Sequence, residues 1–251
     1  MTNASPFSTN RRDFIELLAV GLTLASVAGP RAFAQTSALS ALKIATIGAG
    51  REGGALGTLF AKRGHSVLFS SRHPEGLKDL VAAAGPTARA GTVAEAVAFG
   101  EVIILAVPYT AVEGIGREFG SALAAKPLII DVSNPIPARD GRDFVDRIKS
   151  EGGPGVVTAK LLNGARVVRG FNAIHYASLE EISHRQGERI GIPIAGDDPA
   201  AIDLANRLIR EIGFEPVLIG GLAKGGYLVP GTPLSGEHTA AEIRRIVATL
   251  G

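Results

Sequence analysis

The stretch that decides the fold reads Leu42-Lys43-Ile44-Ala45-Thr46-Ile47-Gly48-Ala49-Gly50-Arg51-Glu52-Gly53. Its first half is a short apolar run, which is typical of a buried strand. Its three glycines have the G-x-G-x-x-G spacing, and an amphipathic stretch over residues 52–62 follows them. A strand, this turn and a helix in that order form a dinucleotide-binding unit. The stretch therefore predicts a Rossmann-type α/β fold.

Each glycine of this turn has its own physical role. Gly48 permits the tight turn, Gly50 lets a diphosphate approach the bare backbone, and Gly53 lets the helix pack close to the strand. The free N–H groups and the positive dipole end of the helix then face the phosphates. A glycine-rich turn without a ligand is the alternative. The residues expected at the dinucleotide are Gly48, Ala49, Gly50, Arg51, Glu52 and Gly53.

The end of the next predicted strand indicates which dinucleotide binds. An NAD site needs a carboxylate there for the ribose 2′-hydroxyl, and this end has none before Glu75. Ser71 and Arg72 instead offer a hydroxyl and a guanidinium, which suit a 2′-phosphate. Arg51 could stack on the adenine or reach the same phosphate. We therefore predict NADP(H), with His73 also at this end of the site; a solvated loop cation is the alternative for Arg72.

Apolar runs and helical stretches alternate along the rest of the chain. Strands are expected at residues 42–47, 66–70, 102–107, 128–132, 166–169, 190–195 and 216–219, and helices at 52–62, 74–84, 93–99, 109–119, 198–212 and 237–250. This alternation is typical of a doubly wound, mostly parallel sheet with helices on both faces. We expect a single domain over residues 35–251, in which the part after about residue 170 extends the sheet.

Residues 1–34 are expected to be a leader. The run Asn10-Arg11-Arg12-Asp13-Phe14 precedes an apolar stretch at 17–29, and Ala32-Phe33-Ala34 is a small-x-small cleavage site. The apolar stretch is too short to cross a bilayer of about 30 Å as a helix. The paired arginines resemble a twin-arginine signal, which exports folded proteins. We expect a periplasmic protein with no membrane span after processing; an N-terminal amphipathic helix that stays on the protein is the alternative.

Composition and charge exclude several classes. Of 251 residues, 46% are hydrophobic and 20% charged, which allows a folded core. The absence of Cys excludes disulfides and thiolate metal sites. A net charge of +2 is too small an excess to indicate a nucleic-acid-binding surface, and 10 Phe, 3 Tyr and no Trp argue against a base-stacking surface. The histidines lack metal-site spacing, and Asp198 before Pro199 is expected to cap a helix rather than form an acid–base pair with Asp197.

A series of short motifs resembles those of one known group of enzymes. In order they are Ile47-Gly48-Ala49-Gly50, Gly64-His65, Ser71-Arg72, Ala106-Val107-Pro108, Asp131-Val132-Ser133-Asn134-Pro135, Gly170-Phe171-Asn172-Ala173-Ile174, Ala195-Gly196-Asp197-Asp198, Ile212-Gly213-Phe214 and Gly220-Gly221-Leu222. Together they resemble the NADPH-dependent reductases of the deazaflavin coenzyme F420 and the related oxidoreductase domain of membrane metalloreductases. Pyrroline-carboxylate reductases share the N-terminal part.

The resemblance implies roles for matching positions. It places Ser71 and Arg72 at the 2′-phosphate. It implies a nicotinamide side formed by Ala106, Val107, Pro108 and Tyr109, and a pocket edge formed by Asn134, Pro135, Phe171 and Asn172. It also implies direct hydride transfer, to which the protein contributes geometry and electrostatics. His175 could donate a proton near this pocket; a loop-edge histidine with one hydrogen bond is the alternative.

The leading hypothesis is an NADP(H)-dependent oxidoreductase that passes hydride to a deazaflavin, flavin, or small carbonyl or imine acceptor. A non-catalytic protein that senses or carries NADP is the second hypothesis. A cyclic imine reductase would need a dimerising helical C-terminal domain, and the strands expected after residue 186 argue against it. The acceptor is a small molecule of unknown identity, the direction of transfer is open, and a homodimer is the assembly we consider.

Overall fold

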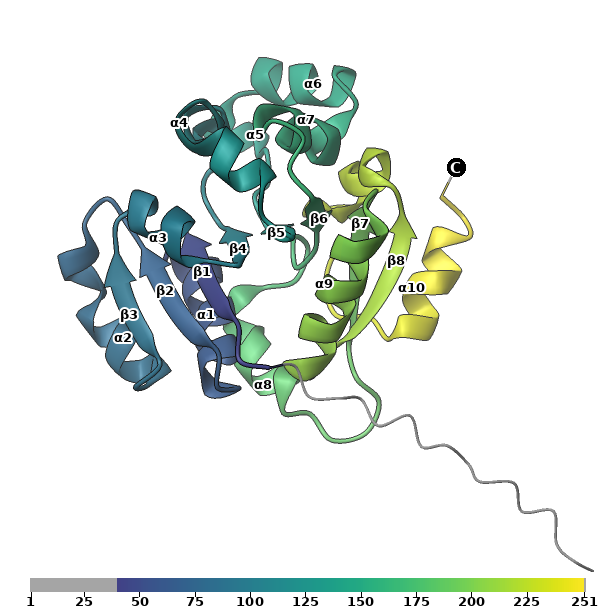
Figure 1. Ribbon diagram of the computed structural model, residues 1–251. Helices are drawn as coiled ribbons and strands as arrows, with labels where there is room; N and C mark the ends of the chain where they lie inside the picture. Colours follow the sequence, from purple (N-terminus) through teal and green to yellow (C-terminus); the bar gives the residue numbers. More distant parts are fainter. Residues whose placement is uncertain (1–39, 251) are drawn as a thin grey trace, which may run out of the picture. The chain divides into compact units, whose positions relative to one another are not determined.

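The computed structural model describes residues 40–250, so the predicted leader lies outside the described residues. The described residues belong to one compact unit. Its centre is a sheet of eight strands in the order β3-β2-β1-β4-β5-β6-β7-β8 (Figure 1). The strands are β1 (Lys43–Ile47), β2 (Ser66–Ser70), β3 (Ala88–Gly91), β4 (Val102–Leu105), β5 (Leu128–Asp131), β6 (Val167–Arg169), β7 (Gly191–Gly196) and β8 (Glu215–Gly220).

All neighbouring strands of this sheet run parallel except β6 and β7, which are antiparallel. The observed sheet is therefore of the Rossmann type, doubly wound and mostly parallel, as the sequence predicts. The part of the chain after residue 170 adds β7 and β8 beyond β6, so it extends the sheet.

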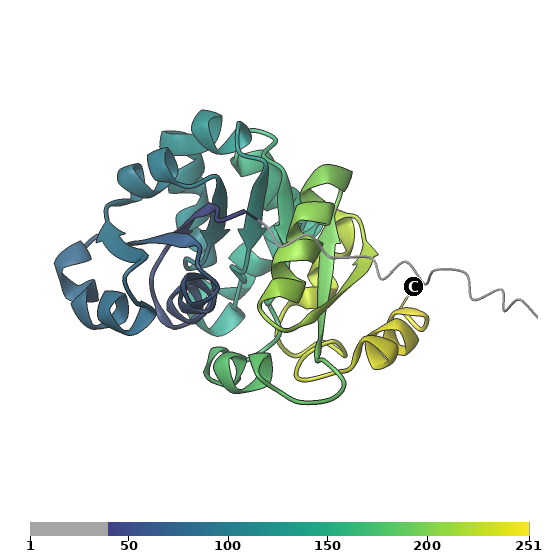
Figure 2. The same ribbon diagram turned by 60° about the horizontal axis from the view of Figure 1, so that its bottom comes forward.

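Helices cover both faces of the sheet, and Figure 2 shows them on both sides of the N-terminal strands. The α-helices are α1 (Arg51–Lys62), α2 (Lys78–Ala84), α3 (Val93–Phe99), α4 (Val112–Ala124), α5 (Pro137–Asp140), α6 (Arg142–Ser150), α7 (Gly153–Leu161), α8 (Leu179–Ser183), α9 (Pro199–Glu211) and α10 (Ala240–Val247). Short 3-10 helices are η1 (Pro74–Leu77), η2 (Tyr109–Ala111), η3 (Tyr176–Ser178) and η4 (Leu222–Leu228).

The two faces of the sheet build two apolar cores because successive strand residues point to opposite sides. Ile104 packs in the core under α1 and α9, whereas its neighbours Ile103 and Leu105 pack in the core under α3, α4 and α7. A third, smaller cluster joins α10 to β7 and β8. No helix within residues 40–250 is long and apolar enough to cross a bilayer.

The observed elements differ from the predicted ones in a few places. Strand β3 was not predicted, because Ala88-Arg89-Ala90-Gly91 has no apolar pattern and is held at the sheet edge by its pairing with β2. The helices from α5 to α8 were not predicted either. The predicted strand at 102–107 ends at Leu105, and the predicted helix at 109–119 begins as η2 and continues as α4 to Ala124. Asp198 caps α9 as expected, since its carboxylate accepts a hydrogen bond from the Ala201 N–H at 2.8 Å.

Candidate functional site

The carboxyl ends of the central strands meet at one edge of the sheet. Ile47 at the end of β1 is in register with Leu105 of β4, Leu105 with Asp131 of β5, and Asp131 with Arg169 of β6. The loops that leave these four strands therefore lie next to one another. The chain order reverses between β1 and β4, and ligands of open α/β sheets bind at such a point.

The glycine turn after β1 has the geometry that a bound diphosphate needs. Gly48 has a φ of +93°, and a Cβ there would lie 2.4 Å from the Ala106 carbonyl oxygen. A Cβ on Gly53 would lie 2.1 Å from the Gly48 carbonyl oxygen, so α1 packs against the turn. A Cβ on Gly50 would meet nothing within 4 Å, which leaves that backbone open to a ligand. Gly50 also caps α1 without a side chain, so the N–H groups of the first turn can bind an anion.

A cavity of about 610 Å³ lies on one side of this turn. We call it the Arg72 cavity. It is lined by Ile47, Gly48, Ala49, Gly50, Ser70, Ser71, Arg72, Val93, Ala106, Val107, Pro108, Thr110, Ala111 and Ile115. No carboxylate lines it, and Arg72 has no acidic partner among the described residues. The Ser71 hydroxyl oxygen accepts a hydrogen bond from the His73 N–H at 3.0 Å, which fixes the loop that carries Arg72.

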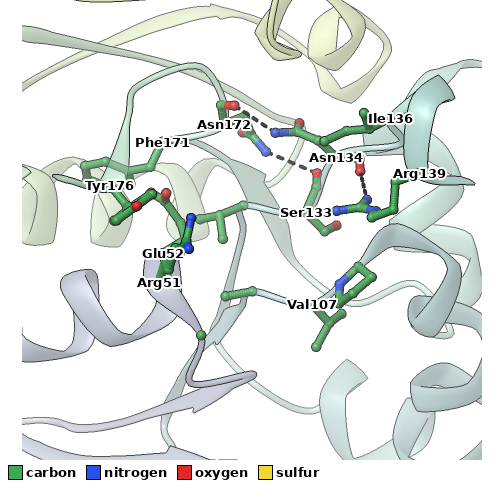
Figure 3. Close-up of a pocket in the computed structure, with 14 residues that line it drawn as sticks. Arg51, Glu52, Val107, Ser133, Asn134, Ile136, Arg139, Phe171, Asn172 and Tyr176 are labelled. Carbon is green, nitrogen blue, oxygen red and sulfur yellow. Dashed lines mark hydrogen bonds between the residues drawn. The ribbon is translucent and has the colours of Figure 1, made fainter. Parts of the chain in front are cut away.

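A second cavity of about 520 Å³ lies on the other side of the turn. We call it the Glu52 cavity. It is lined by Gly50, Arg51, Glu52, Ala106, Val107, Pro108, Val132, Ser133, Asn134, Ile136, Arg139, Phe171, Asn172 and Tyr176. Figure 3 shows Arg51, Glu52 and Tyr176 on one side of it and Ser133, Asn134 and Arg139 on the other. The two cavities share Gly50, Ala106, Val107 and Pro108, so they adjoin at the glycine turn, and we call the pair the cleft.

A buried polar network holds the wall of the Glu52 cavity. Arg169 and Asp131 are fully buried and form an ion pair of 2.6 Å. The Arg169 guanidinium also donates to the Asn134 side-chain oxygen at 3.0 Å, and the Asn134 amide donates to the Asn172 carbonyl at 2.7 Å. The Asn172 amide in turn donates to the Asp131 carbonyl at 3.0 Å. The side-chain amides of Asn134 and Asn172 are therefore each held in one orientation by this network.

Strained backbone presents Asn172 to the cavity. Phe171, next to it, has a φ of +62°, a conformation that non-glycine residues rarely adopt. Its buried ring packs edge-on against Phe214 with centroids 5.7 Å apart, and this contact holds the strained residue in place. The side-chain oxygen of Asn172 is buried and has no hydrogen-bond partner among the described residues. It can accept a hydrogen bond from an N–H group of a bound ligand.

Glu52 and Arg51 form the opposite wall. One carboxyl oxygen of Glu52 is buried without a hydrogen-bond partner among the described residues, and burial raises the pKa of Glu52 to about 7. The Arg51 guanidinium lies over the Tyr176 ring, 5.5 Å from its centroid. Across the cavity, Arg139 donates to the Asn134 carbonyl at 2.6 Å and pairs with Asp140.

Most of the residues predicted at the cofactor and the substrate pocket line one of the two cavities, and five do not. One of the five is Gly53, which packs against the Gly48 carbonyl oxygen. Tyr109 is 1% exposed, and its hydroxyl donates to the Pro154 carbonyl at 2.8 Å inside the core, where burial raises its pKa. Pro135 is buried and lines neither cavity. His73 is an exposed residue beside Glu75, 3.4 Å away. His175 lies outside both cavities, and its ring nitrogen accepts from the Ala177 N–H at the start of η3.

Two of the residues predicted at the glycine turn have a different place from the one we expect. Arg51 lines the Glu52 cavity and not the cavity that holds Ser71 and Arg72, so in this conformation it reaches neither an adenine nor a 2′-phosphate there. The Ala49 N–H donates to the Ser70 carbonyl at 3.0 Å, so it holds the turn to β2 and is not free for a phosphate.

Sequence reasoning gave no site role to several lining residues. Ser133 lies within the quoted motif Asp131–Pro135 and Tyr176 follows His175, so proximity to Asn134 and His175 could have suggested them. Ile136 directly follows the same motif, whereas Arg139 has no such signal, because α5 brings it to the cavity. The buried Arg169 has none either, since its role depends on a partner 38 residues away.

Comparison with known proteins agrees with this geometry. Residues 43–135 match the family described as NADP oxidoreductase, coenzyme F420-dependent. This match supports an oxidoreductase that uses a nicotinamide cofactor and does not specify the acceptor. The matched segment holds β1 to β5, which carry the glycine turn and Arg72. No curated protein matches the chain.

Several solved structures share the fold. A hypothetical protein from Sinorhizobium meliloti is 27% identical, with a TM-score of 0.67, and the match covers 80% of this chain and 96% of that one. A putative F420-dependent NADP reductase from an Arthrobacter species is 20% identical, with a TM-score of 0.63 and coverage of 74% and 87%. An imine reductase from Bacillus cereus is 22% identical, with a TM-score of 0.54 and coverage of 73% and 56%. The last two likenesses show a common fold alone.

Proposed function

We propose that this protein is an NADP(H)-dependent oxidoreductase that transfers hydride between NADPH and a deazaflavin, flavin, or small carbonyl or imine acceptor. The observation that carries the proposal is the cleft formed by the two adjoining cavities at the glycine turn. One end of the cleft has Ser71, Arg72 and no carboxylate, and the other has a walled cavity with fixed polar groups. A dinucleotide with a phosphate at its adenosine end fits this distribution of charge.

Each part of the cleft would hold a different part of the cofactor. The open backbone at Gly50 and the first turn of α1 would bind the diphosphate. Ser71 and Arg72 would bind the 2′-phosphate, and Val107 and Pro108 would line the path to the Glu52 cavity. When bound, NADPH supplies hydride to an acceptor. The protein orients both molecules, and the apolar part of the Glu52 cavity, which includes Val107, Val132 and Phe171, helps to exclude water.

The first test is selective loss of NADPH binding. A charge-assisted hydrogen bond contributes about 1.5–3 kcal/mol, so Arg72→Ala should weaken NADPH binding about 10- to 150-fold. NADH has no 2′-phosphate and should bind the variant as it binds the wild type. Calorimetric titration with both coenzymes measures the two affinities. Arg63→Ala, which removes an exposed arginine outside both cavities, is the matched control. Equal losses for NADPH and NADH would contradict the 2′-phosphate assignment.

The second test separates an enzyme from a binding protein. Purified protein is mixed with NADPH and a panel of deazaflavin, flavin, carbonyl and imine acceptors, and the absorbance of the reduced nicotinamide is followed. We expect saturable oxidation with at least one acceptor class. Saturable binding without acceptor-dependent oxidation would instead identify a protein that senses or carries NADP. Absence of binding to either coenzyme would overturn the proposed function.

A further inference from the structure

Glu52 has an unusual place for a carboxylate. It is the second residue of α1, in the first turn that we assign to the diphosphate, and its side chain lines the cavity assigned to the acceptor (Figure 3). One of its oxygens is buried with no partner among the described residues. A buried polar atom without a partner is costly, so a group in this position is commonly kept for a ligand or a reaction.

The surroundings of Glu52 favour its neutral form. The positive end of a helix favours a carboxylate, but burial outweighs it here and raises the pKa to about 7. The other ionisable side chains that line the cavity are Arg51 on the same helix, Tyr176 on η3 and Arg139 on α5. Arg51 lies over the Tyr176 ring and Arg139 pairs with Asp140, so neither arginine forms an ion pair with Glu52.

The other elements packed on α1 add no charge to this cavity. Helix α8 contributes Glu180, which pairs with Lys62 at the far end of α1, and the exposed Glu181. The other charged groups are the exposed Lys78 and Asp79 on α2 and the exposed Lys43 on β1, and none of them lines the cavity. The neighbouring strand β2 has no ionisable side chain within its bounds. An anionic diphosphate bound at the first turn of α1 would be the nearest new charge, and a nearby negative charge favours the protonated acid.

We propose, on the basis of the proposed function, that Glu52 takes up a proton when NADPH binds and supplies that proton to the acceptor as the acceptor receives hydride. The acceptor class that fits is a carbonyl or imine. Its carbon forms the new C–H bond, the π bond to oxygen or nitrogen breaks, and the released electron pair takes the proton of Glu52. The acceptor is reduced by two electrons and NADPH is oxidised to NADP⁺. Glu52 is left as a carboxylate and regains its proton from water.

Among the residues that line this cavity, Tyr176 is the main competitor for the role. Arginine cannot release its proton in a protein, which excludes Arg51 and Arg139. A phenol can donate a proton, so Tyr176→Phe must be compared with Glu52→Gln. Both substitutions keep the size of the side chain. Glu113→Gln is the matched control, because Glu113 is the second residue of α4, exposed, and lines neither cavity.

Proton uptake on binding gives a test that needs no acceptor. NADPH is titrated calorimetrically into the full-length protein at pH 8, in buffers with different ionisation enthalpies. Unliganded Glu52 is then mostly ionised, so the wild type and Glu113→Gln should take up close to one proton for each NADPH bound, whereas Glu52→Gln should take up almost none. NADP⁺ carries a positive ring that favours the carboxylate, so it should drive less uptake than NADPH.

The outcomes separate this inference from the proposed function. If NADPH does not bind the wild type, the proposed function fails. If NADPH binds but uptake is absent, or is unchanged in Glu52→Gln, the role of Glu52 fails alone. Equal uptake with NADPH and NADP⁺ would mean that the nicotinamide ring lies too far from Glu52 to affect its charge, which would overturn the role of Glu52 as proton donor to the acceptor.

Kinetics with an acceptor from the panel provide the second readout. General acid catalysis contributes about 10²- to 10⁴-fold. At about pH 6, where Glu52 is mostly protonated with or without NADPH, Glu52→Gln should therefore lower kcat by about that factor and leave the KM for NADPH nearly unchanged. The wild-type kcat should fall as the pH rises through the pKa of Glu52 in the complex, and the variant should lose this dependence. A comparable loss in Tyr176→Phe with little loss in Glu52→Gln would assign the proton to Tyr176 and overturn the proposal.

Discussion

Glu52 should also make the unliganded protein less stable as the pH rises. Its pKa is about 7 in the folded protein, against an ordinary value of 4.5. Between these two values the folded state binds more protons than the unfolded state, so raising the pH favours unfolding. At about 1.4 kcal/mol for each pH unit between the two values, the loss reaches about 3 kcal/mol and is complete somewhat above pH 7.

Glu52→Gln removes this titration, which urea unfolding can measure. The variant should be more stable than the wild type by about 3 kcal/mol at pH 8, and the two should be similar at pH 4.5. Glu113→Gln should follow the wild type at both pH values. A gain of the same size at pH 4.5 and pH 8 would mean that the side-chain amide acts through packing and not through the removal of a buried charge.

The buried pair of Asp131 and Arg169 shows a different use of charge. Desolvating two ions commonly costs as much as their attraction returns, so such a pair is weak evidence for stability. Here the guanidinium and the Asp131 carbonyl also hold the side chains of Asn134 and Asn172, which line the Glu52 cavity. The pair is better explained as a support that orients the cavity amides than as a source of folding energy.

At the scale of an element, α1 depends on close contact with the turn that precedes it. Alanine substitutions at the adjacent Gly53 and Gly54 distinguish the effect of this contact from the effect of helix propensity. Gly53→Ala would place a methyl group 2.1 Å from the Gly48 carbonyl oxygen. It should destabilise the fold by about 1–3 kcal/mol through overpacking and weaken NADPH binding, because the turn must shift. Gly54→Ala meets only the flexible end of Leu80, at 3.3 Å, so helix propensity should keep its effect between neutral and a gain of about 1 kcal/mol.

Thermal unfolding and NADPH titration of the two variants check this prediction. Similar effects of Gly53→Ala and Gly54→Ala on both measurements would mean that α1 does not rely on the close approach. Both variants replace glycine by alanine in the same helix, so the change in helix propensity is nearly the same in the two.

The same contrast between local and distant contacts explains which elements the sequence predicts. β1, β2, β4 and β5 are predicted because each is an apolar run buried on both faces. β3 and α7 (Gly153–Leu161) are not predicted, because small residues form them only where neighbours pack: a Cβ on Gly155 would lie 2.6 Å from the Leu222 carbonyl oxygen. No local pattern in the chain encodes such a neighbour.

The same contrast between local and distant contacts explains which site residues the sequence predicts. The glycine turn, Ser71 and Arg72 are identified by local chemistry, since a phosphate site needs bare backbone and a cation within one βα unit. Arg139 reaches the Glu52 cavity only through tertiary structure, and the buried Arg169 supports the cavity wall only through its contacts with Asp131 and Asn134. The expectation for Tyr109 was wrong about its environment, because η2 turns the ring into the core.

At the scale of the whole molecule, the two cavities draw on different parts of the chain. All residues that line the Arg72 cavity lie within the segment that matches the NADP oxidoreductase family, residues 43–135. The Glu52 cavity also takes Ile136, Arg139, Phe171, Asn172 and Tyr176 from beyond that segment. Coenzyme binding can therefore be argued from the matched segment, whereas acceptor choice depends on residues outside it. This division explains why the coenzyme is easier to propose than the acceptor.

The last prediction concerns the start of the chain. We propose that residues 1–34 are a twin-arginine leader and that the mature protein starts at Gln35. The first strand of the described fold begins at Lys43, so removal of the leader takes no described strand or helix. In a host with this export route, the periplasmic protein should have the mass of the chain from Gln35 and should bind NADPH like the full-length chain.

Replacement of both Arg11 and Arg12 by lysine tests the route directly. A twin-arginine system reads the guanidinium pair, so the double variant should stay inside the cell at full mass, and Arg31→Lys, outside the pair, should still be exported. Cell fractionation followed by mass spectrometry distinguishes these outcomes. Export of the double variant at the wild-type level would exclude the twin-arginine route, and a periplasmic protein that keeps its first 34 residues would exclude cleavage. NADPH bound to the periplasmic protein on isolation would show that folding and loading precede export, as a route for folded proteins requires.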